Sequence, residues 1–222
     1  MKKIFFVMCL IPAALIANGQ ENPNGQLINR GTVYVKESTQ VEGSPFLFEN
    51  WMHGIVVVDG GKMYNVSQLK FDENKNKFVY NEKDTIYELS NVASSVVLYP
   101  SYPDTSKKMI FKKGFQSNGI FSNDFVEVLA EGKITMLKQS GKNIIEYSDY
   151  GSSGKVRKYV DVKRYLILQN NKYTTVSLGK KVFETLVPDK QAEMAAFVKQ
   201  NNLSGKSEED WAKYLNYYNG LQ

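Results

Sequence analysis

The chain has 222 residues, 42% of them hydrophobic, which is enough to bury the core of one large β domain or two small ones. Its formal net charge is +5, a mild basic excess that does not favour a nucleic-acid-binding protein. One cysteine and one histidine exclude a scaffold held by internal disulfides and a metal site built on a histidine pair.

Residues 1–19 have the order of a secretory signal peptide. Two lysines precede an almost unbroken apolar run from Ile4 to Ala17, and small residues ending at Gly19 provide the cleavage site. The apolar run is too short for a stop-transfer helix. We therefore expect the mature chain to begin at Gln20 and to be exported, either to the periplasm or to the extracellular space.

Cys9 lies within this segment and raises the alternative of a lipoprotein signal. The residues before it are Phe6, Val7 and Met8, where that signal requires Leu and small residues, and the apolar run continues past it. We expect a chain that does not span a membrane after signal cleavage and that has no cysteine nucleophile.

Residues 20–31 are rich in Asn, Gly and Gln and predict a flexible leader. From residue 32 to residue 178, short runs of β-branched and aromatic residues alternate with brief turns such as Asn170–Asn171. This pattern predicts an antiparallel β meander that forms a sandwich or a partly open barrel. The expected strands are 32–36, 55–58, 68–72, 78–80, 86–89, 95–99, 109–112, 125–130, 134–138, 144–148, 156–160, 165–169 and 172–176.

The pattern changes to helical spacing in residues 179–222, so we expect two to three short helices packed on the β domain. Val182, Phe183, Leu186 and Val187 predict a first helix that ends at Pro188. A second apolar face follows at residues 194–198. Ser207 is a predicted N-cap, and the last helix has an apolar stripe formed by Trp211, Tyr214, Leu215 and Tyr218.

Asp72, Asn74 and Asn76 have the alternating oxygen ligands that open a calcium loop. The sixth position is Lys77, where the loop needs Gly, and the twelfth is Lys83, where it needs a bidentate Glu. A hairpin turn is therefore the favoured interpretation, and we predict no metal and no cofactor.

Two further segments resemble catalytic motifs only in part. Residues 205–207 have the Gly-Lys-Ser ending of a phosphate loop without its earlier glycine, and Ser152 and Ser153 lack the nucleophile elbow. We assign no catalytic residue.

Four aromatic residues are the candidate binding residues: Trp51, His53, Tyr99 and Tyr102. Tyr99 and Tyr102 belong to a loop stiffened by prolines, and aromatic rings suit recognition of a carbohydrate or a protein. Packing within strands is the competing interpretation, and an ordinary structural role is favoured for His53.

Nine basic residues fall on predicted strands or beside them and would form a basic face if those strands were neighbours. Such a face would suit an acidic glycan or a lipid headgroup, although ordinary solvated strand faces are favoured. These residues are Lys107, Lys108, Lys112, Lys113, Lys155, Arg157, Lys158, Lys163 and Arg164.

Three stretches carry a resemblance to a known group. They are residues 43–46 with Trp51 and Gly54, residues 69–72, and the C-terminal residues 186–219. Together they resemble uncharacterised signal-peptide-bearing secreted proteins of the Bacteroidota. The resemblance implies an envelope or extracellular location and transfers no catalytic residue. Residues 84–86, Asp-Thr-Ile, also match the short O-glycosylation pattern of that group.

The sequence favours an exported, non-enzymatic envelope or binding protein. Two alternatives stay open: a secreted glycan hydrolase that uses paired carboxylates, which need no sequence motif, and a carrier of an apolar ligand inside a partly open barrel. A glycan, an envelope protein or an apolar ligand are the expected partners.

Overall fold

The computed structural model describes residues 31–36, 40–148, 155–179, 181–182 and 186–221. The expected signal peptide and nearly all of the leader lie outside these residues. So do Ser152, Ser153 and the centre of the first expected C-terminal helix.

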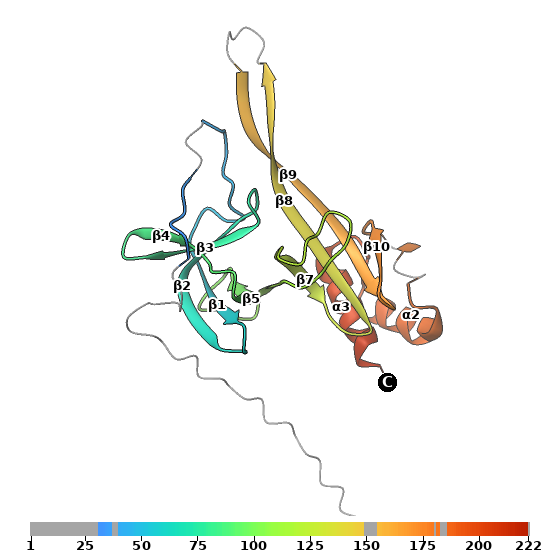
Figure 1. The fold of residues 1–222 in the computed structure, drawn as a ribbon. Coiled ribbons are helices and arrows are strands. Elements are labelled where there is room, and N and C mark those ends of the chain that lie inside the picture. The colour runs from blue at the N-terminus through green and yellow to red at the C-terminus, as the bar shows by residue number, and fades with distance from the viewer. Residues whose placement is uncertain (1–30, 37–39, 149–154, 180, 183–185, 222) are drawn as a thin grey trace, which may run out of the picture.

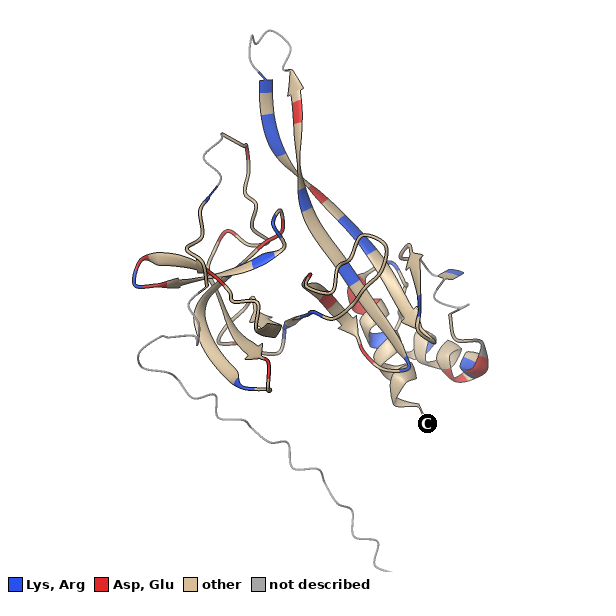
Figure 2. Cartoon of the chain, viewed as in Figure 1, with Lys and Arg blue, Asp and Glu red and all other residues tan. Residues whose placement is uncertain are grey.

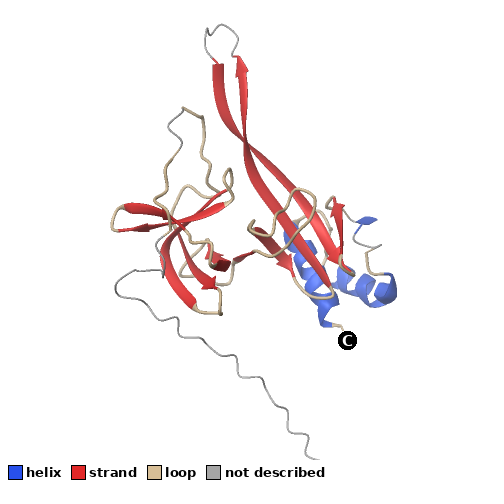
Figure 3. Ribbon diagram, in the orientation of Figure 1, coloured by secondary structure: helices blue, strands red, loops and turns tan. Residues whose placement is uncertain are grey.

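A single antiparallel sheet forms most of the described chain (Figures 1 and 3). Its strand order is β10-β9-β8-β7-β6-β5-β1-β2-β3-β4, so consecutive strands are neighbours except where β5 returns to the free side of β1. The sheet stays open, and the expectation of a mainly β fold with a helical C-terminus is confirmed. The strands are β1 (Met52–Val58), β2 (Met63–Asp72), β3 (Lys77–Glu82), β4 (Thr85–Glu88), β5 (Ala93–Tyr99), β6 (Met109–Lys112), β7 (Val126–Ala130), β8 (Ile134–Ser148), β9 (Lys155–Gln169) and β10 (Lys172–Val176).

Strands β1–β6 enclose an aromatic core. The ring of Phe78 lies 4.7 Å from that of Phe71, 5.2 Å from that of Phe111 and 4.9 Å from that of Phe125, centroid to centroid. Gly54 is required beside this core, because a Cβ there would lie 2.5 Å from the Val97 carbonyl oxygen. Close packing of the strands therefore depends on the missing side chain.

The part of the sheet formed by β7, β10 and the paired ends of β8 and β9 is covered on both faces. Helices α2 (Gln191–Gln200) and α3 (Glu208–Gly220) pack on one face, and the loop between β6 and β7 places Ile120 on the other. Ser207 caps α3 by accepting a hydrogen bond from the Asp210 N–H at 3.1 Å. The predicted apolar stripe of α3 is confirmed, since all four of its residues are buried: Trp211, Tyr214, Leu215 and Tyr218.

Strands β8 and β9 form one continuous ladder with an uninterrupted register from Ile134–Gln169 to Ser148–Lys155. The prediction of two separate strands on each side was therefore wrong. Gly141, Asp161 and the polar residues around them interrupt the apolar pattern without interrupting the hydrogen bonds. Beyond the segments paired with β7 and β10, this hairpin projects from the sheet (Figure 1). We call residues 139–148 and 155–164 the arm.

The expected first strand at residues 32–36 is reduced to an isolated bridge between Val33 and Tyr87. Val33 and Val35 are both exposed, so the segment buries too little apolar surface to extend the sheet.

The middle of the arm is attached to the first half of the sheet through Lys142. The Lys142 Nζ donates to the carbonyl oxygens of Ser44 at 3.0 Å and Phe46 at 2.7 Å. The backbone of Lys142 also donates to the Glu73 carbonyl at 3.2 Å and accepts from the Asn74 side chain at 2.8 Å. These bonds fix the arm against the turn between β2 and β3.

No helix within the described part of the chain is long and apolar enough to cross a bilayer.

A charged row joins the sheet to the start of α3. Lys138 lies 3.2 Å from the Glu127 carboxylate and 2.9 Å from that of Glu208, which also accepts a hydrogen bond from the Tyr165 hydroxyl at 2.6 Å. Burial alone would raise the pKa of Glu208, but the bonds from Tyr165 and Lys138 outweigh burial and hold this pKa below its ordinary value of 4.5.

Glu208→Gln tests this row. At pH 7 we expect a loss of about 1–2 kcal/mol in the free energy of unfolding, because the charge-assisted bonds are weakened. Because folding lowers this pKa, the ionised carboxylate stabilises the fold at pH values above its ordinary pKa. This stabilisation is lost as the pH falls through the lowered pKa. The unfolding curves of wild type and variant should therefore converge in acid. Glu209→Gln, in the same helical turn but exposed, is the control and should show no comparable loss.

Candidate functional site

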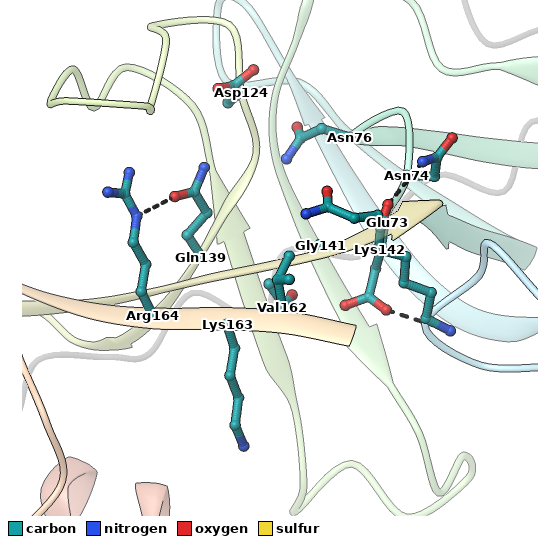
Figure 4. A pocket seen from close by; sticks show the side chains of 12 residues that line it. Glu73, Asn74, Asn76, Asp124, Gln139, Gly141, Lys142, Val162, Lys163 and Arg164 are labelled. Atoms are coloured by element: carbon teal, nitrogen blue, oxygen red, sulfur yellow. Dashed lines mark hydrogen bonds and ion pairs between the residues drawn. The ribbon is translucent and has the colours of Figure 1, made fainter. Parts of the chain in front are cut away.

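A polar cavity of about 360 Å³ lies at the base of the arm, between the β2–β3 turn and the loop that precedes β7 (Figure 4). Four separate segments of the sequence supply its walls: residues 73–76, residue 124, residues 139–143 and residues 162–164. The lining residues are Glu73, Asn74, Asn76, Asp124, Gln139, Ser140, Gly141, Lys142, Asn143, Val162, Lys163 and Arg164.

The β2–β3 turn is built by its own side chains. Asp72 is fully buried, and its Oδ1 accepts the backbone N–H groups of Asn74 and Lys75, both at 2.9 Å. Asn76 adopts a left-handed conformation with φ 52°, which Asn tolerates better than most residues. The residues that resemble a calcium loop thus form an Asx turn, and no group of three or more metal-ligating residues occurs in the described chain.

Asn76 connects this turn to Phe125, the residue that precedes β7. Its amide accepts from the Phe125 N–H at 2.7 Å and donates to the Phe125 carbonyl at 3.0 Å. One side chain therefore satisfies both backbone groups of a residue that lies 49 positions later in the chain.

Arg164 is held in place at the opposite wall. Its Nε donates to the Gln139 Oε1 at 2.6 Å, its Nη2 donates to the Asn118 carbonyl, and Gln139 in turn donates to the Gly119 carbonyl at 2.7 Å. A guanidinium carries five N–H donors, and these bonds use two of them. The cavity thus contains a positioned cation with donors to spare.

The other two cations of the lining are directed elsewhere. The Lys142 ammonium is occupied by the two backbone carbonyls described above. Lys163 extends to the other side of the β8–β9 ribbon in Figure 4, where its Nζ lies 3.9 Å from the Glu208 carboxylate. Arg164 is therefore the cation that faces the cavity.

Two carboxylates line the cavity in different surroundings. Burial raises the pKa of Glu73, while a hydrogen bond from Ser140 and the charge of Lys142, 3.8 Å away, act against that rise. In Figure 4 the Glu73 carboxylate is turned toward Lys142, whereas Asp124 lies beside Asn76. Asp124 accepts the Phe121 N–H at 2.8 Å. Each acid is thus held by its own donor, which is not the arrangement of a facing acid–base pair.

The four residues predicted for binding lie outside this cavity. Antiparallel pairing of β1 and β5 places His53 opposite Tyr99, with ring centroids 6.5 Å apart, and His53 stacks on Tyr102 at 4.0 Å. Trp51 instead lies under the Lys70 ammonium, 4.9 Å from it. Three of the four residues therefore meet in one aromatic cluster, of which Tyr102 is the exposed member.

The nine basic residues do not form one face. Figure 2 shows Lys and Arg along β9, whereas Lys112 is on β6 and is separated from β9 by two strands. The strand order therefore does not bring all nine residues together on one face of neighbouring strands.

The sequence interpretation missed the cavity. Asn74 and Asn76 belong to the calcium-like pattern and Arg164 to the basic residues, and neither pattern indicates a cavity. Gly141 between two strand-like runs is a local signal, since a glycine inside a strand often marks the approach of a ligand or another backbone.

Comparison with known protein families, curated proteins and solved structures finds no match to this chain.

Asn76→Ala tests the contact between the β2–β3 turn and Phe125, which precedes β7. The variant leaves the Phe125 N–H and carbonyl without their partner, so the free energy of unfolding should fall by about 1–3 kcal/mol in urea denaturation. Asn143→Ala is the matched control, because Asn143 lines the same cavity but is exposed. An equal loss in both variants would contradict the role given to Asn76.

Proposed function

We propose that this chain is an exported, non-enzymatic binding protein that holds a small hydroxyl-bearing ligand, of the glycan class, in the cavity at the base of the arm. The observation that carries the proposal is the pre-positioned Arg164, fixed by Gln139 and the Asn118 carbonyl inside a polar cavity. A cation already held in its binding geometry loses little side-chain entropy when a ligand arrives.

The chemistry of the lining supports a glycan over an apolar ligand. Arg164 offers donors, Asp124 offers a carboxylate oxygen, and the exposed Asn143 amide offers both a donor and an acceptor. Neighbouring sugar hydroxyls need this mixture. A volume of about 360 Å³ is at the small end of ligand pockets and suits one or two sugar rings.

Export to the periplasm or the extracellular space is the second part of the proposal. It is supported by the signal-peptide pattern of residues 1–19 and by the resemblance to secreted proteins. In either compartment a sugar-binding cavity has access to envelope glycans.

Arg164→Ala tests the proposed site. We expect oligosaccharides that bind the wild type, found by screening a panel of neutral and acidic oligosaccharides, to bind the variant at least about tenfold more weakly in titration calorimetry. Lys163→Ala is the matched control: it removes the same charge from the next residue, which extends away from the cavity, and should leave affinity unchanged.

Two results would overturn the proposal. One is a panel without any binder; the other is equal weakening by Arg164→Ala and Lys163→Ala. Release of new reducing ends from a bound oligosaccharide would instead support the carboxylate hydrolase.

Gly141→Val tests the cavity by volume instead of charge. A Cβ at position 141 would lie 3.4 Å from Val162 Cγ2 and 3.5 Å from the Glu73 carbonyl oxygen, which are ordinary contacts. Replacing a strand glycine by a β-branched residue suits the strand, so stability should be kept while the side chain fills the cavity and abolishes binding. Undiminished affinity in a folded Gly141→Val variant would place the ligand elsewhere.

A further inference from the structure

The arm exposes large apolar side chains along one of its faces. Ile145, Tyr147 and Val162 share one face of the arm and are 46%, 40% and 42% exposed. An isolated two-stranded ribbon is marginally stable in water, and three or more strands with an apolar face are needed for independent stability. The arm therefore gains from an additional strand.

The β9 edge of the arm is protected against such an addition. Glu42 already pairs with it, donating to the Arg157 carbonyl at 2.8 Å and accepting from the Tyr159 N–H at 3.1 Å. Basic side chains also line this strand, and edge charges of one sign oppose pairing with a like strand. These basic residues are Lys155, Arg157, Lys158 and Lys163.

The β8 edge has neither kind of protection. The backbone N–H and C=O of Lys142 point away from β9, toward residues 73 and 74. Because successive residues of a strand direct these groups to opposite sides, those of Ile144, Glu146 and Ser148 also point away from β9. No described residue bonds to these groups. The single charge of residues 143–148, on Glu146, is paired with Lys155 at 2.6 Å. This edge is therefore open and nearly neutral.

We propose that the β8 edge of the arm pairs with the same edge of a second copy of this chain, antiparallel and with Ile145 on the two-fold axis. The neutral edge can meet its own copy without repulsion, while the basic β9 strands stay on the outside. The charge difference between the two edges therefore favours a second copy of this chain, bound through its β8 edge, as the partner.

The register follows from the outward groups. With Ile145 opposite Ile145 of the second copy, residue 144 forms a hydrogen-bonded pair with residue 146 of the other chain. The two isoleucines then form a non-hydrogen-bonded pair, in which side chains are closest. A register centred on Glu146 would oppose two like charges and is disfavoured. The result is a four-stranded sheet in which the two Ile145 side chains contact each other, each followed by Lys158 on the neighbouring β9 strand.

Ile145→Cys, combined with Cys9→Ser in the full chain, tests the register. Residues in a non-hydrogen-bonded antiparallel pair have Cα atoms about 4.5 Å apart, within the range that a disulfide spans. Mild oxidation should therefore yield a covalent dimer. Val162→Cys, on the same face and similarly exposed, is the matched control and should stay monomeric.

Sedimentation velocity tests the edge itself. Glu146→Pro removes an outward N–H and leaves the inward bonds to β9, so it should weaken the dimer by about tenfold or more. Asp161→Pro does the same on the β9 edge, where it also removes the longer contact to Lys142 at 3.8 Å, and should leave the dimer intact. A wild-type chain that sediments as a monomer at every concentration, or a cross-link at Val162→Cys but not at Ile145→Cys, would overturn the proposal.

Discussion

Strands β8 and β9 are each 15 residues long and remain paired along their whole length, and the positions of the other parts depend on this ladder. Its base lies between helices α2 and α3 on one face and the β6–β7 loop on the other. Its middle supplies Gln139, Gly141 and Arg164 to the cavity. Its far end carries the exposed edge. One hairpin thus links the folded core, the candidate ligand site and the proposed interface.

Two kinds of interaction hold this ladder, and they differ in strength. The base is held by burial of large apolar side chains such as Trp211 and Met136, each worth roughly 1.5–3 kcal/mol or more. The middle is held by hydrogen bonds around Lys142, whose ion-pair distances of 3.8 Å to Glu73 and Asp161 are long. The short bonds from Lys142 to backbone carbonyls therefore contribute more to its position than the ion pairs do. The cavity lies where apolar burial gives way to this polar contact.

The sequence predicts the fold class because apolar periodicity and turn residues are local signals. The buried stripe of α3 and the Ser207 cap follow from spacing alone, and they are confirmed. The continuity of the arm could not be predicted in the same way. Gly141 and Asp161 break the apolar pattern, although the backbone can hydrogen-bond whatever its side chains are.

The candidate site depends on contacts between residues far apart in the chain, which a single sequence does not contain. Asn76 and Phe125 are 49 residues apart, and the Lys142 ammonium reaches Ser44 across 98 residues. The grouping of the aromatic residues into one cluster could not be predicted for the same reason, since His53 and Tyr99 meet only through the register of β1 with β5. The residue types were visible in the sequence, whereas their grouping required the sheet order.

Hydrogen exchange followed by NMR tests the continuous ladder most directly. Gly141 pairs with Val162 and Asn143 pairs with Val160, and their amides point toward the partner strand. We expect slow exchange for these four amides, as for protected amides in the base of the same hairpin. Exchange at the rate of unstructured chain at these positions, with protection kept in residues 134–138 and 165–169, would contradict a continuous ladder.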